Sequence, residues 1–250
     1  CKTNFIPIDS EHFSIWKLIK NEKPESIKKI ILTASGGPFL NKSIKKIANI
    51  DPKFALKHPN WSMGKKISID SATMINKIYE VIEAKNIFNI PYSKIDILIH
   101  PKSYIHCLLK FKNGLTKIIL HDTTMKIPIF NSIYLNSNKS LKSKTINLQK
   151  LNELNFSTIN LKKYPVVNIL KFLPQSNSLY ETVIVSANDT LVEMFLDKKI
   201  KFTDISKDLL KIIKSKEFLK YKKKIPKNIK EIEELNNYVR SKIRKKVYKS

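Results

Sequence analysis

Glycine and cysteine are scarce in this chain, and each shortage excludes a class of site. Only four of the 250 residues are glycine, and they are too scattered to form the closely spaced glycines of a dinucleotide-binding fingerprint. Cysteine occurs only at Cys1 and Cys107, and two cysteines form neither a disulfide framework nor a zinc site. This usage is typical of a reducing compartment, so we expect the cytoplasm.

Long apolar runs are also missing. No segment approaches the roughly 20 apolar residues that a membrane span needs, and CKTNFIPIDSEHF does not have the charged and then apolar layout of a secretion signal. We therefore expect no membrane partner. With 42% hydrophobic residues, the chain has enough apolar side chains for one large or two modest folded domains.

Arginine is nearly absent although the formal net charge is +26, since Arg occurs only as Arg240 and Arg244. Clustered cations favour nucleic-acid binding, but proteins that read bases and phosphates rely on the planar, bidentate guanidinium group. Lysine, isoleucine and asparagine are abundant throughout, as expected of a proteome under A+T-rich codon pressure. We interpret the charge as compositional drift and expect no nucleic-acid partner.

Strand-like and helical patterns divide the chain into two halves. Strands are expected at 29–33, 95–100, 104–111 and 115–121, and helices at 13–21 and 71–88. Further helices are expected at 165–172, 179–196, 202–214 and 229–247. We predict an α/β (α+β) catalytic domain with a mostly antiparallel sheet over residues 1–134, a linker over 135–163, and an all-α helical bundle over 164–250.

Three of the four glycines lie in two short segments, Gly36 and Gly37 in ASGGPF and Gly64 in WSMGKK. In a chain so poor in glycine, these positions are expected to need backbone freedom or a close approach by a ligand. Gly114 has a simpler explanation, since FKNGLT is typical of the Asn-Gly turn of a β-hairpin.

Asp9 and Glu11 stand two residues apart in IPIDSEH. In an extended backbone, residues i and i+2 point to the same side, so both carboxylates can face one cation. Oxygen ligands favour Mg²⁺ or Mn²⁺ over zinc. The alternative is a solvated acidic turn before a helix at Phe13, and the D-x-E pattern by itself does not separate the two.

A second set of polar residues follows in the predicted helix that starts at Ser71. We place Ser71 at the N-cap, where a helix directs backbone N–H groups toward an anion. One face of this helix then carries a hydroxyl, an amide, an ammonium and a carboxylate, from Thr73, Asn76, Lys77 and Glu80. The alternative is a solvent-facing polar stripe with an ordinary Lys77–Glu80 pair.

The segment HPNWSMGKK places an aromatic ring and a thioether beside a glycine, a composition typical of a loop that closes over a flat apolar ring. His58 is a candidate donor to a phosphate, and Trp61 is a candidate cover for a substrate. Trp61 and Met63 have a second explanation as core residues of a long loop. Ser35 precedes two glycines, which suits a loop whose amides approach a phosphate.

Four segments resemble, in order and approximate spacing, the motifs of the 1-deoxy-D-xylulose 5-phosphate reductoisomerase family: PIDSEH, TASGGPF, HPNWSMGKKISIDSATMINK with Glu80 after it, and IHPKSYIH. The resemblance continues more loosely through KKYPVVNILKF and SANDTLVEMFLDKKIKFTDIS. Members of that family rearrange a sugar phosphate, 1-deoxy-D-xylulose 5-phosphate, and reduce it with NADPH to 2-C-methyl-D-erythritol 4-phosphate in the non-mevalonate isoprenoid pathway. The resemblance implies this activity, with Mn²⁺ or Mg²⁺, in a homodimer of the bacterial cytoplasm, with a plastid-type organelle as the other location.

The resemblance also implies roles for individual residues. It implies metal ligands, with a catalytic role, at Asp9, Glu11 and Glu80. It implies substrate contacts at Ser10, Glu11, Ser35, His58, Ser71, Asn76, Lys77 and Glu80. It implies cofactor contacts at Met63, Gly64 and Met125, and a mobile flap over 35–65 in which Trp61 closes over the substrate.

One departure from the family concerns the cofactor. Family members begin with a Rossmann-type NADPH domain, and this chain does not show its glycine-rich fingerprint. We therefore expect a chain that keeps the metal and phosphate sites and is inactive by itself. Two other classes stay open: a metal-dependent sugar-phosphate phosphatase or lyase, which would turn over without nicotinamide, and a basic nucleic-acid-binding protein, which would bind duplexes with a steep salt dependence.

Overall fold

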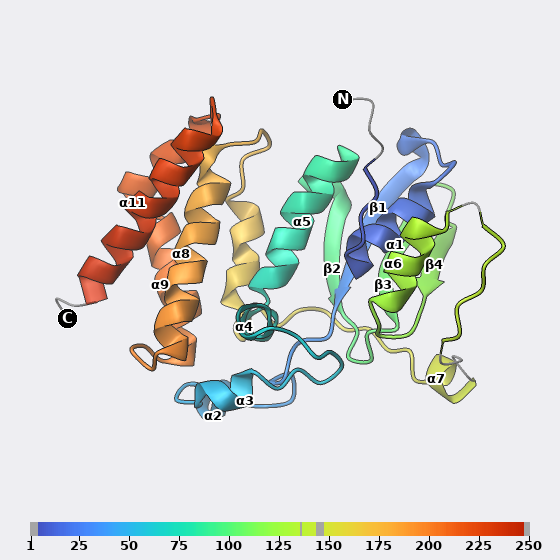
Figure 1. Ribbon diagram of the computed structural model, residues 1–250, viewed down its shortest axis with the longest axis horizontal. Coiled ribbons are helices and arrows are strands. Elements are labelled where there is room, and N and C mark those ends of the chain that lie inside the picture. Colours follow the sequence, from blue (N-terminus) through green and yellow to red (C-terminus); the bar gives the residue numbers. More distant parts are fainter. Residues whose placement is uncertain (1–4, 136, 144–147, 248–250) are drawn as a thin grey trace. The chain divides into compact units, whose positions relative to one another are not determined.

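A computed structural model describes residues 5–135, 137–143 and 148–247, and Figure 1 shows its helices and strands. The chain folds into two compact units. The sheet unit comprises the described residues of Cys1–Gly36, Pro59–Ser62 and Tyr79–Ile159. The helical unit comprises the described residues of Gly37–His58, Met63–Ile78 and Asn160–Ser250. Each unit is therefore assembled from separate segments, and the predicted domain limits at 134 and 163 stay a prediction.

The sheet unit is built on four strands in the order β2-β1-β3-β4 (Figure 1). The strands are β1 (Ile27–Ala34), β2 (Ile95–Ile99), β3 (Ile105–Phe111) and β4 (Thr116–Leu120). Strand β1 runs parallel to β2 and antiparallel to β3, and β3 runs antiparallel to β4. The prediction of a mostly antiparallel sheet beside helices is confirmed, and each strand lies within two residues of its predicted range at either end.

The hairpin between β3 and β4 turns at Gly114, as predicted. Gly114 has a φ of 92°, in the left-handed region that favours glycine. Across the turn, the backbone N–H of Phe111 donates to the carbonyl of Leu115 at 2.9 Å. The Asn113 side chain accepts from the Leu115 N–H at 3.1 Å, so the Asn-Gly pair supplies both the conformation and a polar contact of the turn.

The core of the sheet unit lies on both faces of the sheet, because successive strand residues point to opposite sides. A cluster of Ile31, Ile105 and Leu108 covers one face and packs against further apolar side chains from Leu98, Leu120 and Leu154. Helix α1 (Ser10–Ile19) contacts β3, β4 and β1. Cys107 on β3 is buried and belongs to no disulfide among the described residues, and Cys1 lies outside them.

The other elements of the sheet unit are short, apart from α5. They are α6 (Lys126–Ile133), α7 (Leu148–Asn152), η1 (Pro24–Ser26) and η2 (Tyr92–Lys94), the last two being single 3₁₀ turns. Helix α5 (Ile75–Phe88) begins in the helical unit and continues into the sheet unit, since the division falls between Ile78 and Tyr79.

The helical unit is an all-α bundle around α8 (Leu179–Leu196), as predicted. Its remaining elements are α2 (Ile44–Ile47), α3 (Pro52–Ala55), α4 (Lys65–Thr73), η3 (Pro165–Lys171), α9 (Phe202–Ile213), α10 (Lys216–Leu219), η4 (Lys220–Lys223) and α11 (Ile229–Val247). Helix α8 starts at a capping box in which Ser178 and Glu181 satisfy each other's backbone donors. It then packs against α9 and α11.

Three of the predicted helices in this unit are present with bounds that match closely, namely α8, α9 and α11. The segment predicted as a helix at 165–172 forms the 3₁₀ helix η3. Among the described residues, no helix has the length and apolar character to cross a membrane.

Candidate active site

Asp9 is the N-cap of α1, and this corrects the predicted geometry of the first carboxylate pair. One oxygen of Asp9, Oδ1, accepts from the backbone N–H of Glu11 at 3.0 Å and of His12 at 3.1 Å. The helix therefore begins at Ser10 and not at Phe13, and Glu11 lies in its first turn. The two acids meet because an aspartate cap folds back on the first turn, and not because the backbone is extended.

The start of α1 also offsets the electrostatic repulsion between the Asp9 and Glu11 carboxylates. The first turn of a helix has unpaired N–H groups and the positive end of the helix dipole, both of which stabilise negative charge. Since both N–H groups point to Oδ1 of Asp9, the capping bonds use one carboxylate oxygen of two. Ser10 donates its hydroxyl to Oε2 of Glu11, which orients that carboxylate.

The structure brings a third carboxylate, Glu80 of α5, to this pair. One ligand oxygen each from Asp9, Glu11 and Glu80 lies within 4.8 Å of the other two. Asp9 is exposed, Glu11 half-buried and Glu80 buried. Three negative charges this close repel one another, and a divalent cation held between them would remove that repulsion. An all-oxygen donor set fits Mg²⁺ or Mn²⁺.

His12 joins two of these acids, and sequence reasoning missed it. Its Nε2 donates to the main-chain carbonyl of Glu80 at 3.0 Å, and its Nδ1 lies 3.2 Å from Oδ1 of Asp9. The ring is 3% exposed, so it is a fixed link between α1 and α5. The available signal was its position three residues after Asp9, where a helix cap places it on the same side as the capping carboxylate.

A stacked pair of histidines lies behind Glu11 and was also missed. The rings of His106 on β3 and His121 after β4 have centroids 4.1 Å apart and planes 18° apart. Nδ1 of His106 is 3.7 Å from Oε1 of Glu11. Burial, with His106 adding to it, lowers the pKa of His121 to about 4, so this ring is neutral at pH 7. The sequence contains no local pattern from which the contact between His106 and His121 across the hairpin could be predicted.

The helix predicted to start at Ser71 is interrupted, which corrects the predicted N-cap. Ser71 lies in the last turn of α4, and Met74 then adopts a left-handed backbone with a φ of 71°. The new helix, α5, begins at Ile75, whose N–H approaches the Thr73 hydroxyl at 3.5 Å. A non-glycine residue in this conformation leaves no clear mark in the sequence.

Asn76 and Lys77 therefore occupy the first turn of α5, at the positive end of the helix dipole. Lys77 is 5% exposed and Asn76 is half-buried. Asn76 and Glu80 are four residues apart on one helix and share a face, whereas Thr73 belongs to the preceding helix. The predicted polar face is thus correct for α5 and wrong for Thr73.

The loop with paired glycines approaches α4 closely. Gly36 and Gly37 both have positive φ, 81° and 67°. A Cβ at Gly37 would lie 2.9 Å from Cα of Ala72 and 3.1 Å from the carbonyl of Ser71. The expectation that these two positions need glycine is confirmed. Gly64, the N-cap of α4, has a φ of −63° and open space around it. Its backbone therefore does not require glycine, and the close approach of a ligand at this position stays a prediction.

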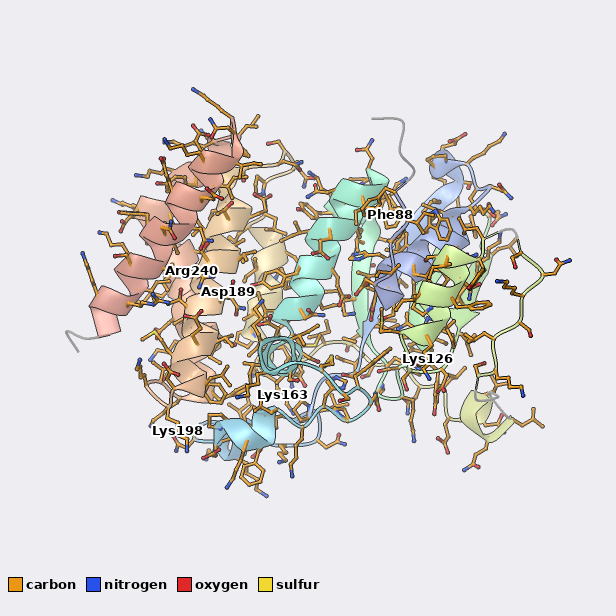
Figure 2. All side chains as sticks on the ribbon, viewed as in Figure 1. Phe88, Lys126, Lys163, Asp189, Lys198 and Arg240 are labelled. Atoms are coloured by element: carbon orange, nitrogen blue, oxygen red, sulfur yellow. The ribbon has the colours of Figure 1, made fainter. Side chains whose placement is uncertain are left out.

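The segment predicted as a flap has several fixed points. Within the helical unit, the Lys163 ammonium donates to the carbonyls of Leu40 and Lys42 at 2.5 and 2.7 Å (Figure 2), and Phe39 packs edge-on against Phe202. Within the sheet unit, Asn60 donates to Pro101 and Ser103, and the Trp61 ring lies edge-on to His106 at 6.1 Å.

The remaining predicted residues lie at the ends of elements. Ser35 follows β1, and Met125 is the N-cap of α6. His58 and Met63 are half-buried in the connection between α3 and α4. Burial lowers the pKa of His58 to about 4, so its ring is neutral at pH 7 and has one N–H to donate. The cofactor, substrate and flap roles of these residues stay predictions.

Two family models match the chain. One, described as the 1-deoxy-D-xylulose 5-phosphate reductoisomerase C-terminal domain, matches residues 5–88. The other, described as the DXP reductoisomerase C-terminal domain, matches residues 120–242. The first range contains the three clustered carboxylates and the second contains the helical bundle.

Curated relatives and solved structures agree with these matches. The chain is 60% identical over 97% of its length to the 1-deoxy-D-xylulose 5-phosphate reductoisomerase of Pelagibacter ubique, covering 62% of that protein. It is 36% identical over 96% of its length to that of Aquifex aeolicus, again covering 62%. The chain therefore spans about three fifths of the curated relatives it matches.

Among solved structures, one of DOX-P reductoisomerase in complex with NADPH, fosmidomycin and magnesium superposes with a TM-score of 0.86 at 33% identity, over 97% of this chain and 63% of that one. The Zymomonas mobilis enzyme in complex with NADPH superposes with a TM-score of 0.85 at 30% identity, over 97% of this chain and 61% of that one. The fold described above is thus shared with these proteins.

Proposed function

Because the chain belongs to the 1-deoxy-D-xylulose 5-phosphate reductoisomerase family, we propose that it forms the metal- and substrate-binding part of such an enzyme. The reaction is the rearrangement of 1-deoxy-D-xylulose 5-phosphate and its NADPH-dependent reduction to 2-C-methyl-D-erythritol 4-phosphate, a step of the non-mevalonate isoprenoid pathway. The observation that carries the proposal is the convergence of Asp9, Glu11 and Glu80 within 4.8 Å. The solved relatives with magnesium and NADPH support the same cofactors here.

Asp9, Glu11 and Glu80 hold the divalent ion in this proposal. Held by these carboxylates, Mn²⁺ or Mg²⁺ would polarise the carbonyl of the sugar and stabilise negative charge on its oxygen. The surrounding side chains keep the ligands in place: Ser10 donates to Glu11, and His12 contacts both the Asp9 carboxylate and the Glu80 main chain. Such outer partners fix ligand orientation before the ion arrives.

The phosphate of the substrate is held by donors from several elements, and Ser10 adds a further substrate contact. The proposed phosphate donors are Ser35, His58, Ser71, Asn76 and Lys77. Lys77 is buried, and an ammonium ion removed from water is stabilised by a nearby anion. The first turn of α5 adds backbone N–H groups of the kind that bind phosphate. Binding the phosphate at one end orients the reacting carbons at the other.

Met63, Gly64 and Met125 contact the nicotinamide in this proposal, and Trp61 covers the substrate. NADPH held by these residues would supply the hydride that reduces the rearranged aldehyde. The two methionines are half-buried, and flexible thioethers adapt well to a flat ring. Trp61 lies edge-on to His106, which in turn lies beside Glu11, and in this proposal closure of the 35–65 flap excludes water from the substrate.

The proposal extends to the setting of the enzyme. We place it in the bacterial cytoplasm, as a homodimer, and we propose that the 250 residues have no turnover by themselves. Bacterial relatives support the first point. The predicted catalytic, linker and bundle domains with limits at 134 and 163 are part of the same proposal.

A chimera tests the function. The 250 residues replace the matching part of the Pelagibacter ubique relative, and NADPH oxidation is followed with 1-deoxy-D-xylulose 5-phosphate as Mn²⁺ is varied. We expect Mn²⁺-dependent turnover that Glu80→Gln abolishes while the fold stays intact. Glu233→Gln, at an exposed position of α11, removes the same charge away from the carboxylate cluster, so it is the control and retains turnover.

Two outcomes would point elsewhere. Loss of the sugar phosphate in a mixture that contains no nicotinamide would indicate a metal-dependent phosphatase or lyase. Unchanged Mn²⁺ dependence in Glu80→Gln would remove Glu80 from the metal site.

A further inference from the structure

A chain of ion pairs and hydrogen bonds connects α4 to α8 and α11 within the helical unit. Nζ of Lys66 lies 2.6 Å from Oδ2 of Asp70 and 3.0 Å from Oδ1 of Asp189. On the other side, the Asn188 side-chain amide donates to Oδ1 of Asp70 at 2.8 Å. We call these four residues, together with Arg240, the ion chain. Both oxygens of Asp70 are engaged, one by Lys66 of its own helix and one by Asn188 of α8.

Arg240 forms the far end of the ion chain, on α11. Its Nη2 donates to Oδ2 of Asp189 at 2.9 Å, and its Nη1 donates to Glu193 at 3.1 Å; Figure 2 shows Arg240 and Asp189 on adjacent helices. Arg244 also donates to Glu193, at 2.9 Å. Both arginines of this lysine-rich chain therefore bind acids of α8. The planar guanidinium group of Arg240 presents its N–H donors in a rigid fork, which suits it to holding Asp189 and Glu193 at once.

Burying the Asp70 carboxylate costs free energy, and a contribution to stability does not by itself explain why an acid occupies this position. It is 1% exposed, and its pKa is raised because burial outweighs the attraction of Lys66. A buried ion pair commonly contributes no more stability than well-packed apolar side chains would. The contacts with Lys66 and Asn188 instead fix the orientation of the Asp70 side chain, because a carboxylate bound on both oxygens has a single orientation.

The orientation that Asp70 fixes is that of the helix carrying Ser71. Asp70 and Ser71 are consecutive in α4, so the rotation of α4 about its axis sets where the Ser71 hydroxyl points. The same helix meets Gly37 through Ala72 and the Ser71 carbonyl. A rotation or slide of α4 would therefore displace both the Ser71 side chain and the loop that contains the paired glycines.

We propose that Asp70 is a positioning residue for phosphate binding, held by Lys66 and Asn188 so that α4 presents Ser71 in one orientation. Asp70 does not touch the substrate. The inference rests on the proposed role of Ser71 in binding the substrate phosphate. It adds that the C-terminal helix α11 takes part in that binding through Arg240 and Asp189, although neither residue reaches the ligand.

Calorimetry on the 250-residue chain tests the proposal with two ligands. Mn²⁺ alone reports on Asp9, Glu11 and Glu80, and 1-deoxy-D-xylulose 5-phosphate added with Mn²⁺ reports on the phosphate contacts. We expect Asp70→Ala to weaken sugar-phosphate binding roughly 10-fold and to leave Mn²⁺ binding unchanged. Asp70→Asn, whose side-chain oxygen still accepts from Asn188, restores part of the loss.

The direction in which sugar-phosphate affinity changes in two variants distinguishes a positioning role of Asp70 from a simple effect of its charge. Asp70→Ala removes a negative charge and Lys66→Gln removes a positive one, so a charge effect on an anion would strengthen binding in the first and weaken it in the second. Positioning weakens binding in both. Lys66 is 46% exposed, so Lys66→Gln is expected to fold even if Asp70→Ala does not. Lys230→Gln removes the same charge from an exposed site on α11 and serves as the control.

The outcomes are distinct. If the unaltered chain binds Mn²⁺ but not the sugar phosphate, the proposed function fails and this inference fails with it. If the unaltered chain binds both ligands and the Asp70 and Lys66 variants bind the sugar phosphate as tightly, the positioning role alone is refuted. The positioning role is also refuted if the variants lose Mn²⁺ binding to the same degree, or if Lys230→Gln behaves like Lys66→Gln.

Discussion

His106 and His121 stack face to face across the β3–β4 hairpin, with 4.1 Å between ring centroids, and Nδ1 of His106 lies 3.7 Å from the Glu11 carboxylate. His121 stacks on the face of the His106 ring, and the Trp61 ring meets it edge-on from another direction. The two contacts together fix the plane of the His106 ring. One proposed metal ligand thus depends on His121 through the ring of His106.

Replacement of His121 should therefore change metal binding according to whether a ring remains. We expect His121→Ala to weaken Mn²⁺ binding about 10-fold, the lower end of what outer-shell partners contribute. His121→Phe keeps a flat ring for stacking and should bind Mn²⁺ within about 3-fold of the unaltered chain. Titration calorimetry measures both, and equal losses in the two variants would show that stacking is not the relevant contact.

Acid stability should also depend on His121. Its pKa in the folded chain is about 4, against an ordinary value of 6.5, so the unfolded chain takes up this proton first as the pH falls. Stability is then complete above pH 6.5 and decreases toward pH 4, by on the order of 3 kcal/mol for this group. Urea unfolding at a series of pH values should show a smaller decrease in His121→Phe. A part of the decrease should persist, because burial lowers the pKa of His58 and His100 as well.

Capping and metal binding by Asp9 can be separated by two substitutions. Asn is as good an N-cap as Asp, so Asp9→Asn should keep the two bonds to the backbone of α1 and the thermal midpoint, while Mn²⁺ binding falls. Asp9→Ala should lose Mn²⁺ binding and also about 1 kcal/mol of stability. Parallel calorimetry and thermal melts check this. Full Mn²⁺ affinity in Asp9→Asn would mean that the charge of Asp9 is not needed.

The glycines should tolerate alanine to different degrees. Gly37→Ala combines a positive φ with a 2.9 Å approach to Ala72, and we expect a loss of more than about 2 kcal/mol. Gly114→Ala has a positive φ but open space, and we expect about 1 kcal/mol. Gly64→Ala, which has neither constraint, should change stability by less than about 1 kcal/mol. Denaturant unfolding of the three variants gives the order, and a Gly64 variant as unstable as Gly37→Ala would contradict this explanation.

Local signals in the sequence were sufficient for several elements. Strand-like apolar runs indicated the four strands, and Asn113-Gly114 indicated the hairpin turn. Helices α8 and α11 followed from long periodic patterns. The cap at Asp9 was also visible in principle, since Asp before a helical pattern with Glu two residues later is a start signal. The interpretation of D-x-E as extended backbone overlooks this signal.

Other features depend on contacts between distant residues and left no local signal. The break at Met74 requires a left-handed non-glycine residue, which the surrounding packing imposes against its intrinsic preference. His12, His106 and His121 become significant only when the fold brings them to the carboxylates and to each other. The link from Asn188 to Asp70 spans 118 positions, and no periodicity relates the two.

Strand β1 has a consequence for how the chain is made. In the described sheet its residues pair with later ones, Ile30 with Ile95 of β2 and with Leu109 of β3. Until the ribosome has added β2 and β3, the apolar side chains of β1 have no strands to pair with and stay exposed. Closing such long loops is slow, and exposed apolar strands attract chaperones or aggregate. Production of this protein in a foreign host should therefore improve when translation is slowed or cooled.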